Sequence, residues 1–504
     1  MLSNIKSISL NGLNGYIIDV QVDVSNGMPL WDIVGLPDAS IRESKDRVIT
    51  AIKNSGYKIQ SKKIVINLAP AGVKKEGSFL DLPMAIGVLS SYEIIKRRNY
   101  ENIVFVGELS LDGKIKSING ILPICIEAKK LGIDAIIIPK GNEQEASIIK
   151  CLNVFVAETL SDVVGFLNGE VSLEECKYGK IKISESNYDY DFADVKGQEN
   201  AKRALEISAA GGHNCLLIGS PGTGKTMLAS RICSILPDLT FEEILEITKV
   251  YSIDGKLNSS NSAITTRPFI SPHHTISSVS LIGGGRNPMP GAVSLANYGV
   301  LFLDELPQFG ISAIEALRGP LEDKKVTITR VSGSATYPCN FMLIASMNPC
   351  PCGYYGSNVK ECRCTEQEIK KYLKRVSGPI LDRIDIHVDV PNIKFEKLDQ
   401  ATEKSCDIKE RVNKARKIQV ERYKKEGIIS NSELNTNLMQ KYCEIDDQSK
   451  KILEIAFEKY GFSMRAYGKV VKVARTIADL EGTENIQKEH IIEAIHYRIL
   501  DKNN

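Results

Sequence analysis

The chain has 504 residues, of which 43% are hydrophobic and 25% charged, a composition typical of a globular protein with about two to four domains. Its 64 basic and 62 acidic residues leave a net charge of +2, which excludes a highly cationic coat but not a local nucleic-acid groove. Twelve cysteines are too sparse for a disulfide scaffold, and no apolar run is long enough to cross a bilayer. Residues 1–11 lack the apolar centre of a signal peptide, so we expect a cytoplasmic protein with no membrane partner.

The first predicted domain covers residues 1–172. Strand-like runs at 64–68, 103–106 and 135–139 alternate with helical stretches at 39–55 and 122–131. This alternation is typical of an α/β fold. The polar residues 173–192, rich in Glu, Lys, Ser and Tyr, are predicted to form a linker.

Residues 193–395 form the second predicted domain and residues 396–504 the third. Short apolar strands at 215–218, 300–303, 341–345 and 384–390 alternate with helices, which indicates a parallel sheet covered on both faces. From residue 396 the pattern becomes helical, most clearly at 463–480, where apolar residues recur at helical spacing. The expected class is therefore α/β, with a helical lid at the C-terminal end.

A Gly-rich segment after the first core strand matches the phosphate-binding P-loop pattern in full and opens a predicted helix at 227–236. Glycines let backbone N–H groups surround phosphates, and the helix N-terminus adds its positive dipole end. The strand and helix disfavour a chance match in a Gly-rich turn. We predict that Lys225 contacts the β- and γ-phosphates of ATP and that Thr226 ligates Mg²⁺. The predicted loop residues are Gly219, Ser220, Pro221, Gly222, Thr223, Gly224, Lys225 and Thr226.

Two adjacent acids, Asp304 and Glu305, end the apolar strand at 300–303. Such a pair is often only the solvated start of a loop. Beside a P-loop it predicts that Asp304 holds Mg²⁺ through water and that Glu305 orients and deprotonates the attacking water.

Two further polar residues complete the predicted ATP site. Asn348 lies just past the strand at 341–345, where its amide can hydrogen-bond the attacking water and the γ-phosphate; a loop-turn asparagine is the alternative. Arg465 lies in the first turn of the helix at 463–480, where a cation opposes the helix dipole. We therefore predict that Arg465 contacts a γ-phosphate, the alternative being an exposed arginine that reaches water.

Four cysteines lie close together in the sequence. Cys350 and Cys352 are separated from Cys362 and Cys364 by a nine-residue loop, and four thiolates of this kind can form a tetrahedral Zn²⁺ site. The C-x-C spacing is less usual than C-x₂-C, and four reduced thiols without metal are the alternative.

Taken together, these motifs resemble those of the magnesium-chelatase-like AAA+ proteins, and in particular the bacterial ComM (YifB-like) branch. The resemblance rests on residues 192–198, 212–214, the P-loop, 267–274, 283–285 and 299–307, and within the branch on 346–353, 377–385 and 465–480. It covers essentially the whole chain. It implies a hexameric ring with ATP between subunits, with Val195 and Gln198 bordering the nucleotide.

The resemblance also implies roles for one arginine and for the N-terminal domain. Arg383 matches the arginine finger that reaches the neighbouring subunit's γ-phosphate; a local ion pair with Asp382 or Asp385 is the alternative. Residues 75–83, 106–114 and 118–123 resemble the proteolytic domain of Lon-type proteases. The nucleophilic serine position holds Phe79 and the lysine position falls near Leu122, so we expect a non-catalytic domain.

Members of this branch carry two inserts that project into the pore of the ring, here at about 265–294 and 326–338. Alternating residues around a Ser-Gly turn predict a hairpin in the second insert. Lys324, Lys325 and Arg330 are candidate contacts to DNA phosphates or, alternatively, solvated charges. The implied function is an ATP-driven DNA translocase that promotes branch migration during natural transformation, acting on branched or single-stranded DNA.

Three other activities are alternatives to the DNA translocase hypothesis. The first is a metal-insertion motor like the magnesium chelatase ATPase, which generally lacks the Lon-like domain and the Cys-Pro-Cys-Gly element. The second is a protein-remodelling ATPase. The third is an ATP-dependent protease, which the missing Ser–Lys pair disfavours.

Overall fold

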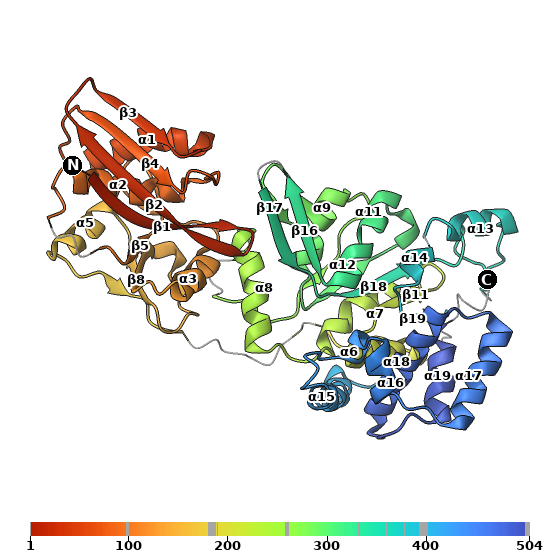
Figure 1. Cartoon of the computed structure of the whole chain (residues 1–504). Helices are drawn as coiled ribbons and strands as arrows, with labels where there is room; N and C mark the ends of the chain where they lie inside the picture. Colours follow the sequence, from red (N-terminus) through yellow and green to blue (C-terminus); the bar gives the residue numbers. More distant parts are fainter. Residues whose placement is uncertain are drawn as a thin grey trace.

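The computed structural model describes residues 2–96, 100–179, 188, 190–257, 262–330, 333–357, 360–376, 378–392 and 402–498. An N-terminal α/β region, a central α/β core and a C-terminal set of helices follow one another along the chain (Figure 1). Within the described ranges, no helix is both long and apolar enough to cross a membrane.

The N-terminal region is built on one mixed sheet of eight strands in the order β10-β9-β8-β5-β1-β2-β4-β3. Buried and exposed residues alternate along β4 because one face of the sheet packs on helices. The strands are β1 (Leu2–Asn11), β2 (Asn14–Ser25), β3 (Leu30–Val34), β4 (Lys63–Ala69), β5 (Ile103–Phe105), β8 (Ala135–Pro139), β9 (Asn153–Ala157) and β10 (Glu174–Glu175), beside the small hairpin β6 (Glu108–Leu109) and β7 (Ile115–Lys116). The helices are α1 (Ala39–Asn54), α2 (Asp81–Ser91), α3 (Ile121–Lys130), α4 (Glu143–Ala146) and α5 (Leu160–Asn168).

The N-terminal region extends beyond the predicted domain end at residue 172. Strand β10 falls inside the predicted linker, yet it pairs antiparallel with β9, and Cys176 packs against the same core. Local polarity alone therefore misplaced the start of the linker by a few residues, because a short edge strand needs no apolar residues of its own.

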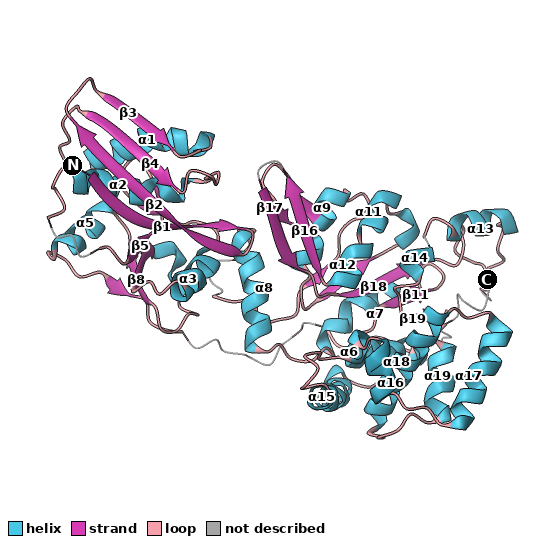
Figure 2. Cartoon of the chain, in the orientation of Figure 1, coloured by secondary structure: helices cyan, strands magenta, loops and turns pink. Residues whose placement is uncertain are grey.

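The central core holds five parallel strands in the order β12-β15-β18-β11-β19. Because the central strands are buried on both faces, they are almost entirely apolar, as predicted, with Ser346 of β18 as a polar exception. The strands are β11 (Cys215–Ile218), β12 (Phe269–Ile270), β15 (Val300–Leu303), β18 (Met342–Met347) and β19 (Ile386–Asp389). Figure 2 shows the helices that surround this sheet. They are α6 (Glu199–Gly211), α7 (Lys225–Arg231), α8 (Phe241–Ile253), α11 (Ile311–Ala316), α12 (Arg318–Asp323), α13 (Glu366–Leu373) and α14 (Gly378–Leu381).

Both predicted inserts form compact structures that pack on each other. The second is the hairpin β16 (Lys325–Arg330) and β17 (Gly333–Pro338); its turn at 331–332 lies outside the described residues. The first insert contains α9 (Ser278–Ile282), the hairpin β13 (Gly283–Gly284) and β14 (Met289–Pro290), and α10 (Ala292–Leu295). The hydroxyl of Tyr337 in β17 donates to the carbonyl of Pro288 at 2.8 Å, which joins the two inserts.

The C-terminal region is helical, as predicted. Ser463 caps the N-terminus of α18, its hydroxyl accepting from the Ala466 amide at 3.2 Å. The helices are α15 (Ser405–Arg422), α16 (Thr436–Tyr442), α17 (Asp447–Tyr460), α18 (Met464–Glu481) and α19 (Lys488–His496). Buried Asp479 of α18 accepts from Arg475 of the same helix at 3.2 Å and from Arg422 at 2.6 Å, and the bond from Arg422 ties α15 to α18.

Among the described residues, the N-terminal region contacts the core around α3 and at the β1–β2 turn. Leu122 of α3 packs with Ile244 and Ile247 of α8 in one apolar cluster, and the Gly120 amide donates to the Ser252 carbonyl at 3.1 Å. The turn between β1 and β2 lies against the core hairpin, since a Cβ added at Gly12 would sit 3.0 Å from Ala335 Cβ.

Candidate nucleotide site and its surroundings

The P-loop follows the carboxyl end of β11 and leads directly into α7, which begins at Lys225 rather than at the predicted residue 227. Gly222 and Gly224 have φ angles of +79° and +88°, and a Cβ added at either would meet no atom within 4 Å. The loop therefore curls in the left-handed conformation that glycine permits, with open space beside Gly222 and Gly224.

The side chain of Lys225 reaches back from the start of α7 into this loop. Its ammonium donates to the carbonyls of Gly219 at 2.7 Å and Ser220 at 2.9 Å, and to Asn348 Oδ1 at 3.2 Å. Burial lowers the pKa of Lys225, while the carboxylates of Asp304 and Glu305 oppose that shift. The loop and Asn348 thus converge on one cation.

The two adjacent acids follow the carboxyl end of β15. Asp304 accepts a hydrogen bond from Thr226 Oγ1 at 2.8 Å through Oδ2, and Ser346 Oγ donates to its Oδ1. Glu305 is exposed and has a φ of +54°, a left-handed conformation that is unusual outside glycine. Its amide donates to Ser346 Oγ and to Asp304 Oδ1, both at 3.1 Å, so these contacts hold the strained backbone.

Ser346 is a residue of this arrangement that we did not predict. It is buried near the end of β18 and bridges Asp304 to the Glu305 amide. A polar residue inside an otherwise apolar strand was the available signal.

The residues present fit a nucleotide with Mg²⁺. The Thr226 hydroxyl and the Asp304 carboxylate supply two hard oxygen ligands side by side, the type that Mg²⁺ prefers. The open loop and Lys225 suit the phosphates. Gln198 contacts the P-loop from its outer side. Its amide nitrogen donates to the Thr223 carbonyl at 3.2 Å and to the Pro391 carbonyl at 2.8 Å. Gln198 therefore supports the loop backbone, and Val195 is buried beside the core.

Arg383 lies at the opposite edge of the core sheet. It precedes β19, whereas the P-loop, Asp304 and Asn348 follow the ends of β11, β15 and β18. Since the strands are parallel and four residues span about 13 Å, Arg383 is remote from the nucleotide site of its own chain. Its guanidinium pairs with Glu322 and donates to the Pro379 carbonyl at 2.5 Å, so the ion pair in the structure is not the one with Asp382 or Asp385 that was the alternative to an arginine finger.

Arg383 borders a cavity of about 510 Å³ between the core and the C-terminal helices. Its Nε is buried without a hydrogen-bond partner among the described residues, and so is the Nε of Arg416 on the same cavity. Burial lowers the pKa of Arg416 to about 10. Two buried guanidinium N–H groups without acceptors suit an anionic group brought in from outside.

Arg465 lies in the first turn of α18, as predicted, with two-thirds of its side chain exposed. Its guanidinium is 3.3 Å from Asp382, the residue before Arg383. The structure thus brings Arg465 towards Arg383, and it places both on the face away from the P-loop.

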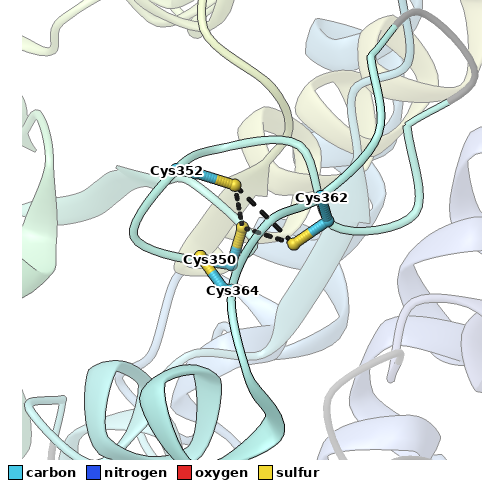
Figure 3. Close-up of side chains that lie close together, drawn as sticks. All are labelled: Cys350, Cys352, Cys362 and Cys364. Atoms are coloured by element: carbon cyan, nitrogen blue, oxygen red, sulfur yellow. Dashed lines mark hydrogen bonds between the residues drawn. The ribbon is translucent and has the colours of Figure 1, made fainter.

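The four clustered cysteines come together immediately beyond β18. Their sulfur atoms all lie within 4.8 Å of one another (Figure 3). Backbone amides of Arg363 and Tyr354 donate to Cys352 and lower the pKa of its thiol to about 6. Such a group of sulfur ligands is suited to a soft or borderline metal ion such as Zn²⁺.

The three residues predicted to contact DNA do not lie together on one surface. Arg330 and Lys325 are exposed at opposite ends of β16. Lys324 instead ends α12 and pairs with Glu433 of the C-terminal region at 2.8 Å, on the cavity that Arg383 borders. The sequence grouped Lys324 with the hairpin because the two are adjacent, but the left-handed φ of +52° at Lys324 turns the chain between them.

In the N-terminal region, Phe79 is half-buried in the apolar core and Leu122 packs against α8. The neighbouring Ser78 donates its hydroxyl to Glu108 rather than to a lysine. The region therefore lacks a Ser–Lys pair at the two positions that the protease resemblance specifies.

Comparison with known proteins matches all three regions. Residues 191–398 match the family described as "Magnesium chelatase, subunit ChlI", residues 20–142 the family "Subunit ChlI of Mg-chelatase", and residues 402–498 the family "Magnesium chelatase, subunit ChlI C-terminal". The chain is 41% identical over 497 residues to "Competence protein ComM" of Haemophilus influenzae, covering 97% of this chain and 96% of that protein. It is 41% identical over 504 residues to YifB of Escherichia coli, covering 99% and 98%.

Two shorter similarities each cover about a third of the chain. "Lon protease 2" of Bacillus subtilis is 27% identical over 180 residues, 32% of each chain, in agreement with the Lon-like fold expected for the N-terminal domain. "DNA repair protein RadA" of Listeria monocytogenes is 31% identical over 158 residues, 31% of this chain and 34% of that protein.

Proposed function

Because the chain belongs to the magnesium-chelatase-like AAA+ ATPases, in their ComM/YifB branch, we propose that it is an ATP-driven DNA translocase that works as a homo-hexameric ring. In this proposal it promotes branch migration of recombination intermediates and acts on branched or single-stranded DNA. Such an activity uses ATP and DNA, so the proposal places the protein in the cytoplasm.

The observation that carries this proposal is the division of charged residues between the two edges of the core sheet. Lys225, Thr226, Asp304 and Asn348 converge at the carboxyl edge. Arg383 and Arg465 lie at the amino edge, at the cavity and near Asp382. Arginines so placed can neutralise the γ-phosphate only of a nucleotide held by another subunit. A ring in which each carboxyl edge meets a neighbour's amino edge provides that arrangement.

The chemistry follows from these positions. Lys225 and the P-loop amides bind the phosphates, and Mg²⁺, held by Thr226 and Asp304, would neutralise charge on them. Glu305 accepts the proton of the attacking water, and Asn348 orients that water. Arg383 of the neighbouring subunit stabilises the charge that develops on the transferred phosphate.

The two packed inserts are the proposed DNA contact. Arg330 lies at the far end of β16, where a Cβ added at Gly284 of β13 would lie 2.9 Å from its Nη2, and exposed Arg286 lies in the β13–β14 turn. Chain direction links this surface to the ATP site, because β17 leads directly into β18, which delivers Asn348. The name of the relative RadA, a DNA repair protein, and that of ComM, a competence protein, support DNA as the partner.

DNA-stimulated ATP hydrolysis tests the proposal. We expect single-stranded or branched DNA to raise the ATPase rate, and DNA binding to weaken steeply with salt as phosphate contacts release counterions. The double variant Arg330→Ala, Lys325→Ala should lower that stimulation and flatten the salt dependence while basal hydrolysis changes little. Lys414→Ala, an exposed lysine paired with Glu410 on α15, is the matched control for loss of surface charge.

Lys324→Ala should be measured separately, because its ion pair with Glu433 places it at the cavity. An ATPase that is indifferent to single-stranded, duplex and branched DNA would contradict the proposal and favour protein remodelling. Stimulation only by a chelatase partner and porphyrin would instead favour a metal-insertion motor.

A further inference from the structure

The segment between β18 and α13, residues 348–365, contains the four clustered cysteines. Cys350 Sγ lies 3.4 Å from Cys352 Sγ and 3.7 Å from Cys362 Sγ, and Cys352 Sγ lies 3.6 Å from Cys362 Sγ. Zn–S bonds of about 2.3 Å in a tetrahedron separate the sulfur atoms by about 3.8 Å. A disulfide would bring two of them to about 2.05 Å. The spacing therefore fits one four-coordinate ion better than a disulfide.

The surroundings of the sulfur atoms also suit thiolate ligands. Cys350 is buried, and its Sγ accepts from the Tyr355 amide at 3.3 Å. Figure 3 shows one pair of cysteines on each arm of the loop, with the sulfur atoms of Cys350, Cys352 and Cys362 directed towards one another. The sulfur of Cys364 lies within 4.8 Å of the other three. Amide donors to metal-bound sulfur are typical of the outer shell of such sites.

A loop of this length needs an interaction within itself to hold one conformation. In its described residues, the segment 348–365 has no helix or strand. Connections longer than about 12–15 residues without secondary structure are uncommon in compact domains, and a metal ion is one way to order them.

The cysteine loop touches the ATP site at two points. Asn348, whose Oδ1 accepts from Lys225, is two residues before Cys350. Gly353, in the turn that follows Cys352, has a φ of +85°, and a Cβ added there would lie 2.5 Å from Pro221 Cδ in the P-loop. The cysteine loop thus contacts the backbone of the P-loop and is directly continuous with Asn348.

We propose that Cys350, Cys352, Cys362 and Cys364 bind one zinc ion, and that this zinc centre holds Asn348 and the Gly353 turn against the P-loop in the geometry that ATP hydrolysis requires. Four thiolates close the coordination sphere, so the ion is structural and takes no part in the reaction. Without it, the loop no longer fixes the position of Asn348. The proposal rests on ATP hydrolysis by this chain but not on DNA as its partner.

Metal analysis of full-length reduced protein, purified without chelator, tests the site itself. We expect about one zinc per chain, and none in the double variant Cys352→Ser, Cys364→Ser. In that variant, ATP turnover should fall at least about tenfold, whereas ATP binding should persist because the P-loop is intact. The absence of zinc from reduced wild-type protein, or iron in its place, overturns the site.

A pair of glycine variants tests the coupling while the cysteines stay intact. Gly353→Ala should keep its zinc and slow ATP turnover about tenfold, because the added methyl group meets Pro221 in the P-loop. Gly356→Ala is the matched control: it lies in the same loop with a φ of +73°, but a Cβ there meets no atom within 4 Å. Thermal unfolding of both variants separates slow turnover from loss of fold.

Equal turnover in the two glycine variants, or wild-type turnover in zinc-free protein, overturns the coupling. The zinc count depends neither on ATP nor on DNA, so it stands apart from the proposed translocase activity. If the wild-type protein binds zinc but DNA does not change its ATPase rate, the proposed translocase activity is contradicted. The proposed coupling between zinc and ATP hydrolysis is then unaffected. Zinc-bound protein without any ATPase contradicts both.

Discussion

At the carboxyl edge of the core sheet, Lys225 contacts Asn348 and Thr226 contacts Asp304, all within one chain. At the amino edge, Arg383 faces a cavity of about 510 Å³ with a buried N–H that lacks an acceptor among the described residues. The first edge holds a hydrogen-bonded set of candidate ligands for phosphate and metal. At the second edge, Arg383 pairs with Glu322 and Arg465 with Asp382, while the Nε of Arg383 has no acceptor among the described residues. Under the proposed function, this difference means that the chain carries two halves of an ATPase site, which come together only between subunits.

The largest effect is expected from removing the Arg383 guanidinium. Arg383→Ala should keep ATP binding and lower turnover by roughly 10³–10⁵-fold, the range of known arginine fingers. The measurement is steady-state ATP hydrolysis beside nucleotide binding. Mixing these subunits with Glu305→Gln subunits should restore some activity, because some interfaces then combine an intact Glu305 with an intact Arg383. A monomer that hydrolyses ATP at the full rate would refute the shared site.

Glu305→Gln should act on the other half alone. The amide cannot accept the proton of the attacking water, so turnover should fall by roughly 10²–10⁴-fold while ATP still binds. Glu305 is exposed and contributes its backbone rather than its side chain to the described hydrogen bonds of the site, so folding should be unaffected. Thermal unfolding and nucleotide binding provide the check. Wild-type turnover would remove Glu305 from its proposed role.

Lys225→Ala should lower ATP affinity itself, by roughly 10–100-fold, since a hydrogen bond from a charged group to phosphate is lost. Titration with a fluorescent nucleotide measures the change. This result would distinguish phosphate binding at the carboxyl edge from charge stabilisation at the amino edge. Equal ATP affinity in the variant and the wild type would contradict the phosphate-binding role of Lys225.

Arg465→Ala should have the smallest effect on stability. Its pair with Asp382 is largely exposed, and such pairs contribute about 0–1 kcal/mol to the free energy of unfolding. Denaturant unfolding should therefore change little, while ATP turnover falls if Arg465 contacts a neighbour's phosphate. Unchanged turnover would leave Arg465 with the exposed ion pair alone.

Much of the carboxyl edge could be predicted from the sequence. Each of its polar residues directly follows an apolar strand, and the ends of parallel strands meet at one edge. The helical C-terminal region and the hairpin β16–β17 were predictable for a similar reason, because their periodicity is local. Ser346 was missed since a single polar residue in an apolar strand has no motif of its own.

The amino edge could not be predicted in the same way. Arg383 pairs with Glu322 rather than with a sequence neighbour, and Lys324 pairs with Glu433 rather than joining Arg330. Strand β10 joined a sheet that its own residues gave no sign of. Each of these contacts depends on segments far apart in the chain.

The sequence by itself determined which residues can bind phosphate and metal, because backbone conformation and ligand chemistry are encoded within a few neighbouring residues. The tertiary structure decided which residues share an edge, a cavity or a loop contact. The approach of Gly353 to Pro221 is the clearest example: 132 positions separate the two residues in the sequence, and only the packing of the cysteine loop on the P-loop brings them together. Local physics fixes the chemistry of each group, whereas burial of distant segments against one another fixes its partners.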